Sequence, residues 1–266
     1  MIFYFSGTGN SSYVANELGR ILKEKVYLIS TVNPATQIFE GERLIFVFPV
    51  YSWGVPPIVI NFILNLSDVF KENLRNNGIP ISVVMTCGDE VGKAPEMIEK
   101  TLEKIGLKVK GIWSVIMPND YVLLPGFDVD SIAVEKDKLK KAPERIQEIS
   151  EGIIEGRETV DVVRGSLAWI KTYLVYPLFK RWGVFPNKWH STPSCVGCGI
   201  CAKVCPLGNV SMTSQRKPKW GNKCCSCVAC YHSCPRHSVE YGNMTGKKGQ
   251  YLHPEKMNIR NDRHPV

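Results

Sequence analysis

Apolar residues in the first half of the chain form short continuous runs, separated by segments with helical periodicity. The runs at residues 2–5, 26–29, 44–50, 79–86 and 109–117 predict five strands. Apolar positions at steps of three and four predict helices near residues 14–22, 56–66, 97–105 and 139–153. Parallel strands need such crossover helices, which cover both faces of the sheet. We therefore predict an α/β fold with a doubly wound, five-stranded parallel sheet.

Three loops follow the carboxyl ends of predicted strands, where open α/β sheets bind their ligands. The first loop places small residues and hydroxyl groups at a helix N-terminus, an arrangement that favours an anionic phosphate. It has neither the Walker lysine ending nor the G-x-G-x-x-G spacing of a dinucleotide fold. Its candidate ligand residues are Ser6, Thr8, Gly9, Asn10, Ser11 and Ser12.

The second and third loops suit a planar ring. Two aromatic residues beside a glycine allow stacking and a close backbone approach, and the third loop supplies backbone donors from a turn. The candidate residues are Pro49, Tyr51, Ser52, Trp53 and Gly54 in the second loop and Thr86, Cys87, Gly88 and Asp89 in the third. Ordinary packing at a sheet edge is the alternative for the two aromatics. Cys87 has the alternative of a buried small side chain, since this half of the chain has no histidine to activate a thiol.

With these three loops, residues 1 to about 153 resemble a flavodoxin. The resemblance implies a flavodoxin-like fold that binds FMN. It places the phosphate among the hydroxyl and amide side chains of the first loop and stacks Tyr51 or Trp53 on the isoalloxazine ring. It also makes the backbone carbonyl of Gly54 the candidate partner of the ring nitrogen N5.

Eight of the ten cysteines form two copies of one pattern. The copies are Cys195-x2-Cys198-x2-Cys201-x3-Cys205-Pro206 and Cys224-x2-Cys227-x2-Cys230-x3-Cys234-Pro235. This is the spacing of bacterial two-cluster ferredoxins, in which the fourth cysteine binds the other cluster. The predicted ligand sets are Cys195, Cys198, Cys201 and Cys234 for one [4Fe-4S] cluster and Cys224, Cys227, Cys230 and Cys205 for the second. Cys225 lies outside the pattern and is expected to be a packed thiol.

Two other uses of cysteine fit this pattern less well. Zinc sites usually take two Cys-x2-Cys pairs separated by a longer spacer, not two triplets that each precede Cys-Pro. A disulfide framework belongs to secreted proteins, whereas Met1 leads directly into a strand-like run without a basic leader. No apolar run has the length of a membrane span, so we expect a cytoplasmic protein.

The net charge of +8 is unevenly distributed. Residues 1–150 contain 16 Lys and Arg against 18 Asp and Glu, whereas residues 151–266 contain 17 against 7. Two clusters would lower the resulting excess of +10 in the second half to about +6. The remainder suits an acidic redox protein that docks at the cysteine-rich half, and we expect no nucleic-acid partner.

An aromatic segment separates the two halves. It contains Trp169, Tyr173, Tyr176, Phe179, Trp182, Phe185 and Trp189, with Lys171, Lys180 and Arg181 among them. Three interpretations stay open: a linker helix that packs the modules together, a dimer or partner surface, and an interfacial membrane anchor. We predict a flavodoxin-like domain at 1–155, a helical linker at 156–190 and a small α+β two-cluster ferredoxin domain with a C-terminal tail at 191–266.

The whole chain resembles a family of flavodoxin-ferredoxin fusion proteins of anaerobes, which implies electron transfer between two [4Fe-4S] clusters and FMN. No NAD(P)H site is apparent, so the expected donor is a ferredoxin or an oxidoreductase. One alternative is an FMN-dependent reductase of a small unsaturated or quinone-like acceptor, under an apolar lid from residues 119–127 or from the aromatic segment. Another is an iron-sulfur adaptor that has lost FMN. His232, between two predicted ligands, is expected to be exposed or to donate to a cluster.

Overall fold

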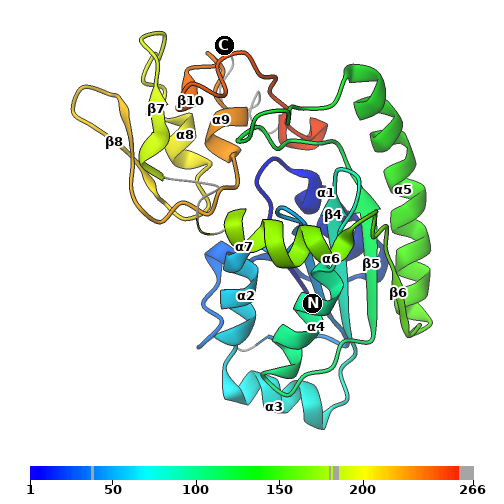
Figure 1. Ribbon diagram of the computed structural model, residues 1–266. Coiled ribbons are helices and arrows are strands. Elements are labelled where there is room, and N and C mark those ends of the chain that lie inside the picture. Colours follow the sequence, from blue (N-terminus) through cyan, green and yellow to red (C-terminus); the bar gives the residue numbers. More distant parts are fainter. Residues whose placement is uncertain (37–38, 180, 182–185, 258–266) are drawn as a thin grey trace. The chain divides into compact units, whose positions relative to one another are not determined.

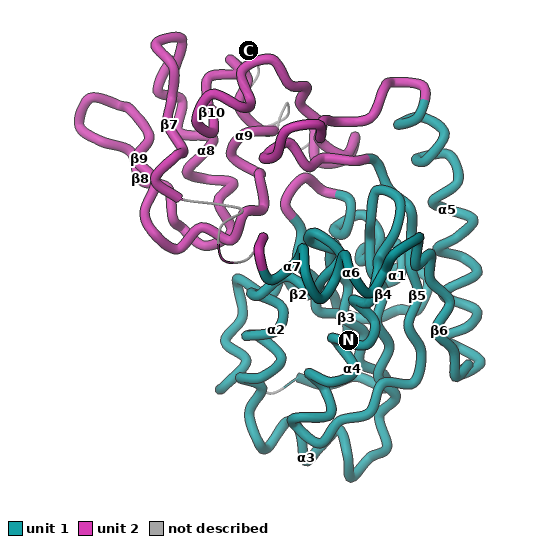
Figure 2. The backbone as a smooth tube through the Cα atoms, in the orientation of Figure 1, with its two compact units in different colours: residues 1–6, 10–118, 134–177 teal, residues 7–9, 119–133, 178–266 magenta. Residues whose placement is uncertain are grey.

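The computed structural model describes residues 1–36, 39–179, 181 and 186–257, and the chain forms two compact units (Figure 2). The first unit comprises residues 1–6, 10–118 and 134–177, and the second comprises residues 7–9, 119–133 and 178–266. The second unit therefore contains two short segments from the first half of the chain in addition to the cysteine-rich half.

The first unit contains a six-stranded parallel sheet with the strand order β2-β1-β3-β4-β5-β6 (Figure 1). Its strands are β1 (Ile2–Tyr4), β2 (Val26–Leu28), β3 (Leu44–Pro49), β4 (Ile81–Cys87), β5 (Gly111–Ile116) and β6 (Thr159–Asp161). The first five follow the flavodoxin-like order, whose topological switch point lies between β1 and β3.

The prediction of five strands was wrong by one. β6 pairs with β5 in parallel, with Gly111 opposite Thr159. Its sequence Thr-Val-Asp contains a single apolar residue, and Val160 is 42% exposed. An edge strand needs no continuous apolar run because only one side of it pairs with the sheet.

Helices cover both faces of this sheet, as the alternation of strands and helices predicted. They are α1 (Asn10–Leu22), α2 (Pro57–Leu64), α3 (Asp68–Asn76), α4 (Ala94–Glu103) and α5 (Ile132–Ile154). Ile45 and Val47 of β3 share a core cluster with apolar residues of α1 and α5. Phe3 lies on the opposite face, with ring centroids 5.1 Å from Phe62 of α2 and 6.4 Å from Phe70 of α3. Each strand thus contributes alternate side chains to two helical layers.

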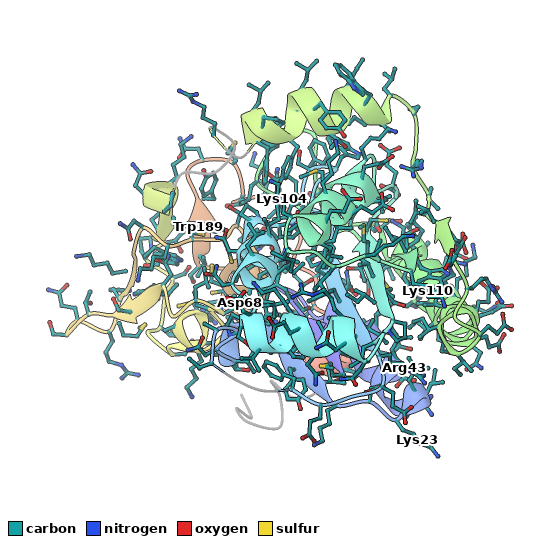
Figure 3. All side chains as sticks on the ribbon, turned by 90° about the horizontal axis from the view of Figure 1, so that it is seen from below. Lys23, Arg43, Asp68, Lys104, Lys110 and Trp189 are labelled. Carbon is teal, nitrogen blue, oxygen red and sulfur yellow. The ribbon has the colours of Figure 1, made fainter. Side chains whose placement is uncertain are left out.

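Charged side chains occupy the outer surface of the first unit. Lys23, Lys104 and Lys110 are exposed at the ends of α1, α4 and the segment before β5 (Figure 3). Among the described residues, no helix combines the length and apolarity needed to cross a membrane.

The cysteine-rich part of the second unit consists of two βαβ halves. The first half has β7 (Trp189–Ser191), α8 (Ile200–Lys203) and β8 (Val210–Met212), and the second has β9 (Pro218–Trp220), α9 (Ala229–His232) and β10 (Val239–Tyr241). The halves exchange strands, since β7 pairs with β10 and β8 with β9, both antiparallel. Each element of the second half begins 29 residues after its counterpart, as Pro218 follows Trp189 and Cys224 follows Cys195.

Residues 119–133 join the second unit through polar and apolar contacts. Val122 and Leu123 are fully buried in its core cluster. Lys248 Nζ donates to the carbonyl of Val122 at 2.7 Å and to that of Leu124 at 2.6 Å. The segment predicted as a lid over the flavin is therefore part of the cysteine-rich unit. Its core explains the apolar residues Val122 and Leu123, whereas Phe127 is 43% exposed.

Candidate cofactor sites

The phosphate loop lies between β1 and α1, where the first N–H groups of a helix have no intrahelical partner. Within the first unit, two predicted ligand residues of this loop fix its C-terminal side. Asn10 Nδ2 donates to the carbonyl of Pro118 at 2.9 Å, and the hydroxyl of Ser11 lies 2.7 Å from that of Thr86. The first and third predicted loops are thereby joined at the ends of β1 and β4.

The centre of this loop, Gly7 to Gly9, belongs to the second unit. The Thr8 hydroxyl donates to the half-buried carboxyl of Asp120, and the backbone N–H of His253 donates to the Thr8 carbonyl at 3.0 Å. Lys256 Nζ donates to the carbonyl of Gly7. Burial raises the pKa of Asp120 and lowers that of Lys256. The carbonyl side of the loop is therefore bonded to the C-terminal segment.

Gly7 also lies directly against the second cysteine triplet. A Cβ atom at this position would be 2.2 Å from the carbonyl oxygen of Cys227. Real Cβ atoms do not approach so closely, so this contact requires glycine at position 7. The centre of the predicted phosphate loop and a predicted cluster ligand are thus adjacent within one compact unit.

The second loop forms a tight turn after β3. Tyr51 and Gly54 exchange two backbone hydrogen bonds of 2.9 Å, and the two residues between them have positive φ values, 46° for Ser52 and 62° for Trp53. Such values are unfavourable for residues with a side chain and concentrate at functional sites. Pro49, at the end of β3, pairs with Thr86 at the end of β4, so the second and third loops leave neighbouring strands.

Trp53 is held by charged residues that the sequence did not single out as site residues. Its indole nitrogen donates to Glu90 at 2.7 Å, and Glu90 also forms an ion pair with Lys171. The Lys171 ammonium lies 5.3 Å from the centroid of the Trp53 ring, within range of a cation–π contact. The indole is fixed in one orientation, but no sequence motif marks Glu90 for this role.

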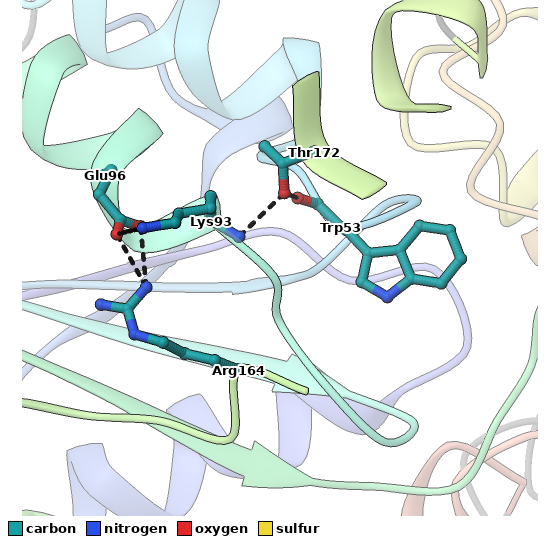
Figure 4. A network of polar contacts seen from close by, with 5 residues as sticks. All are labelled: Trp53, Lys93, Glu96, Arg164 and Thr172. Carbon is teal, nitrogen blue, oxygen red and sulfur yellow. Dashed lines mark hydrogen bonds and ion pairs between the residues drawn. The ribbon is translucent and has the colours of Figure 1, made fainter. Parts of the chain in front are cut away.

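A polar network connects this turn to the aromatic segment (Figure 4). Thr172 donates to the carbonyl of Trp53 at 2.7 Å and accepts from the backbone N–H of Lys93 at 2.9 Å. Arg164 donates to both carboxylate oxygens of Glu96, at 2.9 and 3.0 Å, and Lys93 Nζ donates to one of them at 2.9 Å. The network holds the aromatic segment on the second and third loops.

The aromatic segment is helical, from α6 (Ala168–Ile170) through a π-helical stretch (Lys171–Val175) to α7 (Tyr176–Leu178). Tyr176 is buried, and its hydroxyl donates to the carbonyl of Val55. A Cβ at Gly54 would lie 2.5 Å from the Tyr176 ring, so this glycine permits the close packing. On the other side of the helix, Trp169 and Leu174 are exposed by 60% and 53%. Lys180, Trp182 and Phe185 of the predicted linker lie outside the described residues.

The third loop contributes few side chains to an open site. Cys87 is buried at the end of β4, and burial raises the pKa of its thiol to about 12. Its partners in the loop differ: Gly88 is half-buried, and Asp89 is exposed and lies 3.4 Å from the ammonium of Lys138. At neutral pH the Cys87 thiol is therefore protonated and unreactive.

The eight patterned cysteines line two separate cavities. One is lined by Cys205, Cys224, Cys227 and Cys230, together with Cys225. The other is lined by Cys195, Cys198, Cys201 and Cys234. Each cavity thus combines three cysteines of one triplet with the fourth cysteine of the other copy. In the described part of the chain, no three His, Cys, Asp or Glu side chains are placed to hold a single metal ion.

The two cavities share one kind of hydrogen bond to sulfur, but indole nitrogens line only one of them. The sulfur atoms of Cys205 and Cys234 each accept a backbone N–H at 3.2 Å, from Asn209 and Ser238 respectively. Two buried indole nitrogens, of Trp189 and Trp220, have no geometrically proper hydrogen-bond acceptor among the described residues. Both rings line the cavity of Cys224, with Trp189 beside the sulfur of Cys224 and Trp220 beside that of Cys230. The sequence grouped Trp189 with the aromatic segment and did not single out Trp220.

His232 is buried, so the expectation of an exposed histidine was wrong. Its Nε2 donates to the carbonyl of Asp120 at 2.7 Å, and its Nδ1 accepts the backbone N–H of Tyr251 at 3.0 Å. Burial lowers the pKa of the imidazole to about 4. Both ring nitrogens therefore bond to backbone groups of segments 119–133 and 243–257, not to a cluster.

Comparison with known proteins identifies the first half of the chain. The family model described as flavodoxin domain matches residues 1–116. Among solved structures, the Trp repressor binding protein from Bacillus subtilis is similar at 17% identity and a TM-score of 0.33, over 54% of this chain and 96% of that chain. A search of curated proteins found no match. With its strand order and its three loops, the segment of residues 1–116 is a flavodoxin-like domain, which supports FMN binding.

Proposed function

We propose that this protein transfers electrons between two [4Fe-4S] clusters, bound by its eight patterned cysteines, and FMN, bound by its flavodoxin-like domain. The domain match supports a flavin-dependent redox function. The cysteine spacing and the grouping of the cysteines around two cavities support two clusters with crossed ligand sets.

The observation that carries this proposal is the contact between Gly7 and Cys227. Gly7 belongs to the predicted phosphate loop of FMN, and Cys227 is a predicted ligand of the second cluster. The loop that would hold the FMN phosphate and the loop that contains Cys227 therefore touch within one compact unit. Electron transfer between FMN and a cluster requires their binding loops to lie close together.

Bound FMN would supply two-electron chemistry in one-electron steps, with protons from solvent, and each cluster would carry one electron, so the chain would couple a one-electron donor to the flavin. The chain's own contribution is to hold and shield these groups. Its turn at Ser52 and Trp53 presents a fixed aromatic ring, and the charge excess of residues 151–266 attracts an acidic redox protein such as a ferredoxin.

The structure accounts for part of the feature that favoured a small-molecule reductase. Tyr121, Leu123, Leu124 and Phe127 were expected to form an apolar lid. Leu123 belongs to the buried core of the cysteine-rich unit, and Tyr121 packs on Phe127 and Phe179 with ring centroids 5.8 and 5.9 Å apart. The apolar character of Tyr121 and Leu123 therefore needs no substrate to explain it, whereas Phe127 is 43% exposed.

Anaerobic purification with measurement of iron, sulfide and FMN tests the proposal. We expect about eight iron atoms and one FMN per chain, and reoxidation of the reduced protein by carrier proteins faster than by small organic acceptors. A chain that binds no FMN at micromolar concentration, or that holds zinc in place of iron, would contradict the proposal. Reoxidation only by small unsaturated compounds would restore the reductase alternative.

The crossed ligand sets have a test of their own. Cys205→Ala and Cys224→Ala should each lose the same cluster signal in the EPR spectrum of the reduced protein, while Cys195→Ala loses the other signal. Cys225→Ala is the matched control and should keep both. If Cys205→Ala instead matches Cys195→Ala, each cluster takes all four ligands from one copy and the crossed assignment is wrong.

A further inference from the structure

The two cysteine-lined cavities are related by the 29-residue repeat, so each position near one has a counterpart near the other. The repeat conserves the backbone environment. Asn209 and Ser238 are counterparts, and their N–H groups donate to the counterpart sulfur atoms of Cys205 and Cys234 at the same distance of 3.2 Å. Equal surroundings would give the two clusters similar properties.

The indoles of Trp189 and Trp220 break this symmetry. The counterpart of Trp189 is Pro218, which lines the other cavity and has no N–H group. The counterpart of Trp220 is Ser191 in β7. Two donors are therefore present at the cavity of Cys224 without an indole equivalent at the cavity of Cys195.

Each of the two indole nitrogens lies beside one cysteine sulfur of this cavity, Trp189 beside Cys224 and Trp220 beside Cys230. Trp189 is 5% exposed, and its ring stacks on that of Trp220 with centroids 6.4 Å apart and planes inclined by 19°. The stacked pair lies beside the sulfur atoms of Cys224 and Cys230, and neither nitrogen has a proper acceptor among the described residues. Buried polar groups nearly always have partners, and the cysteine sulfur atoms of this cavity are the acceptors beside these two donors.

We infer that Trp189 and Trp220 donate N–H···S hydrogen bonds to the second cluster and thereby stabilise its reduced form. This inference rests on the proposed function. A reduced cluster carries one more negative charge than an oxidised one, so hydrogen bonds to its sulfur atoms become stronger on reduction. They therefore raise the reduction potential of the cluster.

Charged side chains and solvent also differ between the two cavities. Lys223 lines the cavity of Cys224. Arg236 lines the cavity of Cys195, and Lys217 donates to the carbonyl of Cys195 at 2.8 Å, so positive charge favours the reduced state of the first cluster. Cys198 is exposed, whereas no cysteine of the second set is. Solvent favours the reduced state of the first cluster, because water stabilises added charge. The two indoles offset this disadvantage at the second cluster, whose ligand Cys227 lies beside Gly7 of the predicted phosphate loop.

The test is an anaerobic redox titration of the full-length holoprotein, followed by EPR. Trp189→Phe and Trp220→Phe keep an aromatic ring and remove the N–H, and Trp169→Phe, exposed in the aromatic segment, is the matched control. Each of the first two variants should move one cluster to a more negative potential. At a fixed potential near the midpoint, the ratio of reduced to oxidised cluster should fall by about threefold to tenfold per indole.

The cluster that moves must be the one whose signal Cys205→Ala removes. As a second readout, ¹⁵N labelling of tryptophan should give an indole nitrogen coupling in the pulsed EPR spectrum of that cluster, and each variant should lose part of it. Unchanged potentials in both variants, a shift of the other cluster, or no nitrogen coupling would each overturn the inference. A wild-type protein without clusters would overturn the proposed function instead.

Discussion

The two compact units have cores of different composition. In the first unit, residues such as Ile45, Val47 and Trp113 fill the core between a six-stranded sheet and its helices. In the second, strands are three residues long, and three cysteines, Cys201, Cys230 and Cys234, belong to the core cluster itself. The first unit can fold by burying apolar surface, whereas under the proposed function the second would depend on the clusters that its cysteines bind.

Removal of iron should give the largest difference in stability between the two units. We expect an anaerobic chelator to abolish the amide protection of residues 189–241, because their short strands enclose the two cavities. Strands β3, β4 and β5 should keep their protection. Hydrogen exchange followed by mass spectrometry measures both regions in one sample, and equal protection of residues 189–241 with and without iron would contradict the dependence.

A core substitution in the first unit should destabilise that unit and leave the cysteine-rich unit unchanged. Trp113 of β5 is buried, and Trp113→Ala should lower the free energy of unfolding of this unit by about 3–5 kcal/mol through cavity formation. The iron content should stay unchanged. Chemical denaturation followed by the circular dichroism of the helices measures the loss, and Trp169→Ala, at a residue that is 60% exposed, should change it by less than about 0.5 kcal/mol.

Loss of the Thr172 hydroxyl should have a smaller effect. Thr172→Val removes one bond to the carbonyl of Trp53 and one from the N–H of Lys93, which should cost about 1–3 kcal/mol and weaken FMN binding. Thr172→Ser keeps the hydroxyl and should restore FMN affinity, as measured by flavin fluorescence. If the Thr172→Val variant binds FMN as tightly as the Thr172→Ser variant, the hydrogen bonds of Thr172 do not position the turn at Trp53.

The smallest effect concerns Cys87. Its pKa is raised by burial from 9.0 to about 12, so the thiol stays protonated as the pH rises through 9, where an ordinary thiol is half ionised. At pH 9 about one Cys87 in a thousand would be a thiolate. Alkylation of the native protein, followed by peptide mass spectrometry, should leave Cys87 unmodified until the protein is denatured. Rapid modification at pH 9 would show that β4 opens at this end.

Predictability from sequence also differs between the units. The parallel sheet followed from continuous apolar runs, and β6 was missed because an edge strand of Thr, Val and Asp has no such run. In the second unit the cysteine spacing predicted two ligand sets, and the cavities group the same residues. No pattern predicted that residues 119–133 pack with Lys248 and Tyr231, because these contacts join segments more than 100 residues apart.

The sequence by itself determined the alternation of strands and helices, the phosphate loop and the spacing of the cysteines, because these depend on short-range periodicity and on fixed intervals along the chain. Only the tertiary structure decided that Gly7 lies against Cys227 and that the indoles of Trp189 and Trp220 line one cavity without an indole counterpart at the other. Such contacts form where segments distant in the sequence pack together, and the local sequence does not predict which side chains the fold will bring into contact.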